Sequence, residues 1–168
     1  MKIESTLKNR AGQILNLVYC DIDKEEELLG KKVSGVHAYC FFDGKLVIVY
    51  AENKGYWTPP GGGVELAESI TEAVVREVLE ETNMRVIKQE LIGYQDIFEH
   101  GKINTQTRSV CLVEPIDDFV SDPDGDITEI KLIDPKDCKK YFDWGVVGDR
   151  LLDRALEKLS ENKSEIPT

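Results

Sequence analysis

The sequence is poor in basic residues and histidines, and it has no long apolar run. Its 21 lysines and arginines are outnumbered by 32 aspartates and glutamates, so the net charge is −11. Binding to nucleic acid polymers or anionic membranes through charge needs a basic surface, and this composition argues against both partners. No apolar stretch approaches the roughly 20 residues of a membrane span, and no apolar segment typical of a signal peptide follows the first residues. We therefore expect a cytoplasmic protein.

Thiol and imidazole groups that could bind a soft metal are also scarce. The two histidines lie far apart and no two cysteines form a C-x-x-C pair, so the sequence argues against a zinc site. Reduced thiols are the expected state in a cytosolic protein, and we predict it for all four cysteines, Cys20, Cys40, Cys111 and Cys138.

The 168 residues suit one domain with a sizeable core. Asp43-Gly44, between two β-rich runs at 36–42 and 45–50, is a strong hairpin signal. Further strands are predicted at 10–20, 86–98, 105–113 and 127–133, with an acidic turn at 23–29 and a last helix at 147–162. Strands around a central loop and helix, closed by a second helix, predict an α/β sheet covered by helices on both faces.

A glycine-led segment at residues 61–84 carries the densest set of acidic side chains. Ser69 followed by Glu72 is a capping box, so a helix is predicted to begin near Ile70. At 3.6 residues per turn, one arc of about 100° holds three glutamates, namely Glu77, Glu80 and Glu81. The other side of this helix is predicted to pack in the core through Thr71, Val75, Val78, Leu79 and Thr82.

The three glutamates favour a bound cation. Like charges three and four residues apart repel by a few tenths of a kcal/mol per pair. A cation would turn this cost into a gain, and Mg²⁺ prefers carboxylate oxygens and also takes phosphates as ligands. For the three glutamates alone, a solvated acidic helix face is the alternative interpretation.

The wider spacing favours the metal site. The segment reads Gly62-x5-Glu68-x7-Arg76-Glu77-Val78-x-Glu80-Glu81-x-Asn83-Met84. It resembles the Nudix box, G-x5-E-x7-R-E-U-x-E-E-x-G-U, in which U is aliphatic. The one departure is Asn83 in place of the last glycine. Asparagine is among the few residues that readily adopt the left-handed conformation at a helix end, so we expect Asn83 to affect the helix stop and not the chemistry.

The resemblance covers roughly residues 33–160 and implies a Nudix-type α/β/α sandwich around a mixed β-sheet. We divide the chain into an N-terminal extension (1–32), a Nudix hydrolase domain (33–162) and a tail (163–168). The extension, predicted as a strand plus the acidic turn, can add a strand, cover a sheet edge or form part of a homodimer interface. The sequence alone does not choose among these.

The resemblance also implies a role for each residue of the box. The metal, Mg²⁺ with Mn²⁺ as a possible substitute, is held by Glu77, Glu80, Glu81 and the carbonyl of Gly61. Arg76 matches the residue that holds a box glutamate in place, and Glu68 a glutamate of mainly structural role. Gly62 and Gly63 let the loop wrap against the helix start, where anions are favoured, and we assign them to substrate binding.

Residues outside the box bear on the substrate and on proton transfer. Trp57 either stacks on a base or belongs to the core. Arg108, in a predicted strand, either meets a phosphate or is solvent-facing or ion-paired. Family members often add an acid from a late loop or strand start, as a metal ligand or as a base. We expect this acid to be Glu129, with Asp126 and Glu99 as rivals and a plain surface glutamate as the alternative.

The expected function is Mg²⁺-dependent hydrolysis of a pyrophosphate linkage in a nucleoside triphosphate, of the mutator type, with oxidised nucleotides as one candidate class of substrate. A metal neutralises phosphate oxygens and makes a bound water more acidic, so the protein must mainly position and stabilise charge. Two alternatives stay open. One is the same chemistry on a nucleoside diphosphate linked to a sugar or second nucleotide, and the other is a catalytically silent Nudix-fold nucleotide sensor.

Overall fold

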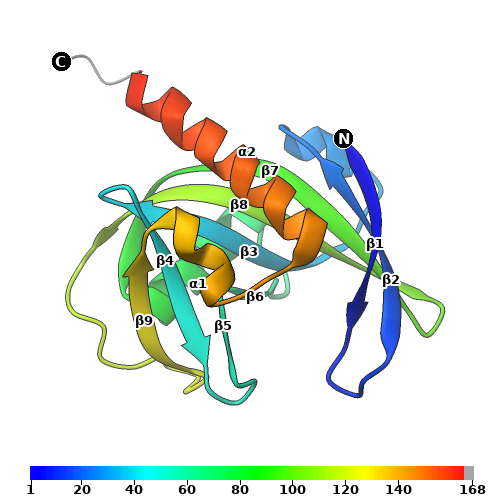
Figure 1. Cartoon of the computed structure of the whole chain (residues 1–168), viewed down its shortest axis with the longest axis horizontal. Helices are drawn as coiled ribbons and strands as arrows, with labels where there is room; N and C mark the ends of the chain where they lie inside the picture. Colours follow the sequence, from blue (N-terminus) through cyan, green and yellow to red (C-terminus); the bar gives the residue numbers. More distant parts are fainter. Residues whose placement is uncertain (165–168) are drawn as a thin grey trace.

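The computed structural model describes residues 1–164, which build one mixed β-sheet with a helix on each face (Figure 1). The strand order is β1-β2-β7-β8-β3-β4-β5, with β6 pairing with β3 and β9 with β4. Pairing is parallel between β3 and β8 and antiparallel elsewhere. The strands are β1 (Lys2–Lys8), β2 (Ile14–Asp21), β3 (Val33–Phe42), β4 (Lys45–Ala51), β5 (Tyr56–Thr58), β6 (Gly61–Gly63), β7 (Met84–Glu99), β8 (Lys102–Pro115) and β9 (Ile127–Ile133).

The helices are α1 (Ile70–Thr82) and α2 (Gly145–Ser164), with short 3-10 turns at η1 (Glu25–Leu28) and η2 (Pro135–Lys140). Alternating residues of β3 face the two helices. Tyr39 and Phe41 pack in one buried cluster with Leu151 of α2. Ala38 packs in the other with Val74 of α1. The predicted α/β/α arrangement is therefore confirmed.

Local signals in the sequence explain several boundaries. Asp43 and Gly44 both have positive φ, 50° and 73°, as the tight turn of the β3–β4 hairpin requires. A second hairpin joins β7 and β8 through His100 and Gly101, also at positive φ. Strand β9 has the predicted bounds, and Asp134 caps η2 by accepting a 3.0 Å hydrogen bond from the Lys136 N–H.

The N-terminal extension adds two strands to the sheet. The predicted strand at 10–20 begins only at Ile14, and β1, which was not predicted, pairs with it along its whole length. β2 in turn pairs with the far half of β7. Arg150 of α2 donates to both carboxylate oxygens of Asp21, the shorter contact being 2.6 Å, and this fixes the extension to the helix. Among the possibilities raised for residues 1–32, the structure shows strand addition.

Helix α1 is rotated relative to the sequence prediction. Thr71, Val75 and Leu79 were expected in the core, but all three are exposed, Val75 and Leu79 over 41% and 43% of their surfaces, so this part of the prediction is wrong. The buried side consists of Ala73, Val74, Val78, Glu81 and Thr82. Counted from Glu77 at 100° per residue, these residues centre at about 60°, so the buried and acidic arcs overlap. One box glutamate therefore points into the protein.

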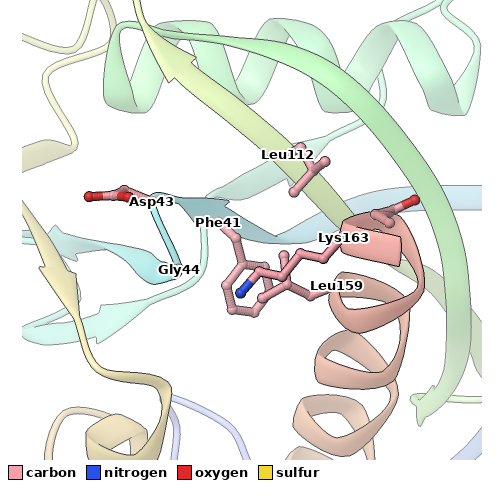
Figure 2. Close-up of a pocket in the computed structure, with 7 residues that line it drawn as sticks. Phe41, Asp43, Gly44, Leu112, Leu159 and Lys163 are labelled. Atoms are coloured by element: carbon pink, nitrogen blue, oxygen red, sulfur yellow. The ribbon is translucent and has the colours of Figure 1, made fainter. Parts of the chain in front are cut away.

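A cavity of about 310 Å³ opens at the hairpin end of β3, away from the box. Phe41, Leu112 and Leu159 form its apolar floor, and Lys163 lies at its rim (Figure 2). Since β6 pairs with residues 35–37 at the other end of β3, this cavity is separate from the glycine-led loop.

Candidate active site

Helix α1 presents the box glutamates to the loop that precedes it. Ser69 is its N-cap, since its side chain accepts a 3.1 Å hydrogen bond from the Glu72 N–H, as the capping box predicts. At the other end Asn83 has φ 55° and ψ 35°, so the left-handed C-cap expected of it is confirmed. Both caps fix the helix length, and hence which glutamates face inward.

Glu81 joins the helix to the loop. Only 6% of its surface is exposed, and its Oε1 accepts a 2.9 Å hydrogen bond from the backbone N–H of Gly61. Gly61 itself pairs with His37 of β3, where a Cβ would lie 2.2 Å from the Val36 carbonyl oxygen. Only glycine fits at this close approach, which holds the loop backbone against the carboxylate.

Arg76 organises the remaining acids. Its Nε and Nη2 donate to the two carboxylate oxygens of Glu68 at 2.7 and 2.8 Å. Its Nη1 donates to Glu77 at 2.8 Å and, more weakly, to Glu80 at 3.4 Å. Nη2 also donates to the Gly63 carbonyl at 2.8 Å. The fork geometry of a guanidinium allows all of these at once, which a lysine could not do.

Gly62 makes room for the Glu77 carboxylate. A Cβ on Gly62 would lie 2.4 Å from Glu77 Oε1, whereas a Cβ on the neighbouring Gly63 would meet nothing closer than 3.8 Å. The two glycines assigned to the substrate loop therefore differ. A side chain at position 62 would clash with Glu77, a predicted metal ligand, whereas position 63 has room for one.

The cluster concentrates unfavourable negative charge. Burial, and to a lesser extent the nearby carboxylates of Glu77 and Asp122, raise the pKa of Glu81 to about 8, against the opposing effect of the Gly61 hydrogen bond. Burial also raises the pKa of Glu77, with Arg76 opposing and Glu80 and Asp124 adding to the rise. A divalent cation would remove this cost, since it favours the ionised carboxylates.

The donor set fits a hard divalent ion. Glu77, Glu80 and Glu81 offer carboxylate oxygens beside the Gly61 backbone, and oxygen-only ligands suit Mg²⁺ or Mn²⁺. Within residues 1–164, no three acidic, histidine or cysteine side chains already converge as a metal cage. The contacts above explain this, because Arg76 draws Glu77 and Glu80 while the Gly61 N–H holds Glu81.

The structure does not bring Glu129 to this cluster. Its neighbour Ile130 packs against the α1-side core, so Glu129 points to the opposite face of β9, where it is exposed. Of its rivals, Asp126 is exposed and accepts a 3.1 Å bond from Asn53, and Glu99 lies at the far end of β7. Among the acids that precede β9, Asp122 contributes to the raised pKa of Glu81 and Asp124 to that of Glu77.

Asp122 was missed by sequence reasoning, although a signal was present. Its side chain accepts 3.1 Å hydrogen bonds from the N–H groups of Asp124 and Ile127, and only 7% of its surface is exposed. Asp-Pro-Asp-Gly is a strong turn sequence, and an aspartate that begins such a turn often accepts backbone hydrogen bonds. That pattern could have placed a fixed carboxylate before β9.

Trp57 and Arg108 both lie on the α2 side of the sheet. Trp57 is half-buried, with its ring 5.2 Å from Tyr50 and 5.9 Å from Tyr141. Arg108 is 3% exposed and donates to the Thr107 carbonyl and to Gln106, so the expectation of a solvent-facing or ion-paired arginine is wrong. Burial lowers the pKa of Arg108 to about 10.

Trp144, just before α2, covers this second group of side chains. Its ring lies 5.2 Å from the Arg108 guanidinium, 5.8 Å from the His37 ring and 6.2 Å from the ring of the buried Tyr39. Within residues 1–164, buried polar atoms of three of these residues lack a hydrogen-bond partner, namely His37 Nδ1, Tyr39 OH and Arg108 Nε.

Two expectations from composition can also be compared with the structure. All four cysteines are free thiols, as predicted. In the part of the chain from residue 1 to 164, no helix is both long and apolar enough to cross a membrane.

Comparison with known proteins places this site in a family. The NUDIX domain model matches residues 31–154, which include every contact of the acidic cluster. The chain therefore belongs to the Nudix hydrolase family.

The individual proteins that match this chain share only part of its sequence. The "Uncharacterized Nudix hydrolase YvcI" of Bacillus subtilis is 37% identical over 51 residues, which are 30% of this chain and only 32% of that protein. The "Putative 8-oxo-dGTP diphosphatase YtkD" of the same organism is 29% identical, over 76% of this chain and 80% of its own length. A crystal structure of a mutant of the B. subtilis pyrophosphohydrolase BsRppH shares the fold, with a TM-score of 0.67, 21% identity and coverage of 94% and 97% of the two chains.

Proposed function

We propose that the protein is a Mg²⁺-dependent enzyme that cleaves a pyrophosphate linkage in a nucleoside triphosphate and releases pyrophosphate and a nucleoside monophosphate. The observation that carries the proposal is the buried, mutually repelling carboxylate pair Glu77 and Glu81, held between the Gly61 N–H and Arg76. A fold without a cation to bind would gain nothing from burying these charges.

Each side chain of the cluster has a distinct task. Glu77, Glu80 and Glu81 would hold the metal, and the Gly61 carbonyl is proposed as a further ligand. When bound, the ion neutralises phosphate oxygens and acidifies a coordinated water. Arg76 keeps the glutamates in position through its bonds to Glu68 and Gly63, so its role is positioning.

The additional acid is proposed to come from the 117–126 loop. Asp122 is buried and fixed by two backbone hydrogen bonds, and its charge raises the pKa of Glu81, which supports a role as a base or an extra ligand. Replacing Asp122 by Asn should slow turnover more than replacing Glu129 by Gln, because Glu129 faces away from α1. Equal effects of the two replacements would return the role to Glu129.

The nucleoside is proposed to bind on the α2 side, near Trp57 and Arg108. Trp57 offers an aromatic face and Arg108 a buried donor with an unpartnered Nε in the described part of the chain. Gly62 and Gly63 place the loop backbone beside the phosphates at the start of α1. The names of YtkD and BsRppH, a diphosphatase of an oxidised nucleotide and a pyrophosphohydrolase, agree with cleavage of such linkages.

Product analysis over a nucleotide panel with Mg²⁺ tests the proposal. The panel contains canonical and oxidised nucleoside triphosphates, nucleoside diphosphate sugars, dinucleoside polyphosphates and a simple phosphomonoester. Pyrophosphate release from triphosphates is the expected result. Activity confined to the diphosphate conjugates would select that substrate class instead, and binding without turnover of any compound would indicate a sensor. Phosphate release from the monoester alone would refute cleavage of a diphosphate linkage.

We also propose a cytoplasmic location. The four free thiols support it, because oxidising compartments favour disulfides.

A further inference from the structure

A row of polar side chains crosses the sheet beside the glycine-led loop. In the strand register, His37 of β3 pairs with Gly61 of β6 on one side and with Arg108 of β8 on the other. Neighbouring strands lie about 4.8 Å apart, so the Arg108 backbone is only about 10 Å from that of Gly61. The loop is also bonded to β3, because Ala38 N–H donates to the Pro60 carbonyl at 2.9 Å. A nucleotide whose phosphates lie at this loop therefore has its base within reach of the row.

The row carries hydrogen-bonding groups that the described part of the chain does not use. Arg108 donates through Nη1 and Nη2, but its Nε is buried without a partner among residues 1–164, and so are the Tyr39 hydroxyl and His37 Nδ1. In the same part of the chain, no carboxylate pairs with the Arg108 guanidinium. Burying polar groups without partners costs stability. These groups therefore point to a ligand that supplies the partners.

The indole ring of Trp144 fills the space from which a ligand would reach these groups. It lies 5.2 Å from the Arg108 guanidinium in a cation–π contact. It also meets the rings of His37 and Tyr39 edge to face, at 5.8 and 6.2 Å between centroids. The one polar group of an indole is an N–H donor, so Trp144 cannot accept a hydrogen bond from Arg108 Nε. The ring thus covers the guanidinium and leaves its donor unsatisfied.

Trp144 has a fitted position that its ring can nevertheless leave. Gly148 of α2 makes room for it, since a Cβ there would lie 2.8 Å from the Trp144 Cβ. Trp144 itself precedes the first helical residue, Gly145, which has a positive φ of 64°. Rotation about the side-chain bonds of Trp144 therefore moves the ring away from Arg108 without disturbing the helix.

We propose that Trp144 occupies the base-binding position in the free protein and that the base of a purine nucleotide displaces it. A purine, like an indole, is a flat pair of fused six- and five-membered rings, so it fills the same space and can stack on the guanidinium. Its ring nitrogens can also accept the Arg108 Nε–H, which an indole cannot do. A pyrimidine has one ring and leaves part of the space empty. The inference rests on the proposed function, since it takes a nucleotide as ligand, and it adds the class of base.

The test measures both affinity and the position of the indole. Binding of the non-hydrolysable α,β-imido analogues of guanosine, adenosine and uridine triphosphate is measured by calorimetry with Mg²⁺. Trp144→Ala empties the position, and Gly148→Ala pushes the indole from it while keeping a residue that suits a helix. Phe98→Ala is the control, because Phe98 is a partly exposed aromatic residue at the far end of β7.

Fluorine NMR of the protein labelled with fluorotryptophan follows the ring itself. The chain has two tryptophans, so the Trp144 signal is the one that Trp144→Ala lacks. Saturation of wild type with a purine analogue should move this signal towards that of free fluorotryptophan, because the ring leaves the protein interior for water.

Wild type should bind the two purine analogues about tenfold more tightly than the uridine analogue. Trp144→Ala should bind the purine analogues about tenfold more tightly than wild type does, because no cation–π contact has to be broken first. Gly148→Ala should lower their Kd by about threefold for the same reason. Phe98→Ala should leave the Kd within about twofold of wild type, since it is remote from the row.

Several outcomes would overturn the assignment. Weaker purine binding by Trp144→Ala would show that the indole stays and stacks on the base. An unchanged Trp144 signal at saturation would show that the ring does not move. Equal affinity for the purine and uridine analogues would remove the class of base. If Trp144→Ala does not fold, a Gly148→Ala variant that binds no more tightly than wild type decides against the proposal.

The same data separate this inference from the proposed function. Binding of the analogues without turnover of any nucleotide would end the proposed function, while the Kd values and the Trp144 signal would still decide the role of Trp144. Absence of analogue binding in wild type and in both site variants would refute both proposals.

Discussion

Replacing Glu81 by Gln should make the metal-free protein more stable at alkaline pH while it removes activity. Glu81 is 6% exposed, and its folded-state pKa of about 8 lies above its ordinary value of 4.5. Between these two pH values the folded protein keeps a proton that the unfolded chain has lost. The free energy of unfolding therefore falls as pH rises through this window, and the full cost persists above pH 8.

The two pKa values set the size of the effect. Their difference corresponds to about 5 kcal/mol at pH 8 if the site stays dry and rigid. Entry of water and movement of the loop reduce this cost, so we expect a gain of roughly 2 to 3 kcal/mol for Glu81→Gln. In a chain of this size the gain corresponds to about 5 to 10 °C in Tm. Glutamine keeps an oxygen that accepts the Gly61 N–H bond, so the fold should be preserved.

The assay is thermal unfolding in chelator at pH 5 and pH 8. The Tm of the wild type should fall more from pH 5 to pH 8 than the Tm of Glu81→Gln does. Glu80→Gln is the matched control on the same helix, because the Glu80 side chain is 27% exposed and should give no such gain. Mg²⁺ at 100 times its Kd should restore about 2.7 kcal/mol to wild type and much less to Glu81→Gln. A Glu81→Gln variant no more stable than wild type at pH 8 would refute the argument.

The remaining predictions concern activity and the helix stop. Chelation should abolish turnover, and Glu81→Gln should lower kcat by at least 100-fold, measured by product release, because a ligand that stabilises charge is lost; full activity in chelator would remove the metal from the reaction. Gly62→Ala should cut kcat more than tenfold, since its Cβ would lie 2.4 Å from Glu77 Oε1, while Gly63→Ala should stay within about threefold; similar rates for the two variants would show that the Glu77 contact is unimportant. Asn83→Gly should leave turnover unchanged and shift the free energy of unfolding by under about 1 kcal/mol, because glycine adopts the left-handed cap freely but loses the 3.1 Å bond to the Asp118 carbonyl. A large loss of rate in that variant, with the fold intact, would assign Asn83 a chemical role.

Local signals in the sequence predicted much of the fold. Asp43-Gly44 and Ser69 with Glu72 each fix a turn or a cap through contacts within a few residues, and the structure has both. The spacing of the box predicted the family because all its residues lie within one short stretch of the sequence. Features that depend on contacts between residues far apart in the chain were predicted less well from the sequence.

The errors arise from tertiary contacts. The rotation of α1 is set by its packing on β3 and by the Glu81–Gly61 bond, and neither appears in the period of the helix alone. The burial of Arg108 results from Trp144, 36 positions later in the chain. Glu129 was expected near α1 because it follows a loop at a strand start, but strand alternation in β9 turns its side chain to the opposite face of the sheet.

Strand β7 has a consequence for how this chain can change over evolution. It follows the α1 cap without a loop, since Ile116 N–H bonds to the Asn83 carbonyl and Met84 is already paired. Its far half pairs with β2, so one strand of 16 residues joins the end of the box helix to the N-terminal extension. Deleting a single residue within β7 would move the side chains of every later residue of that strand to the opposite face of the sheet. Length variation among related sequences should therefore be absent from β7 and concentrated in the 117–126 loop and the turn at residues 9–13.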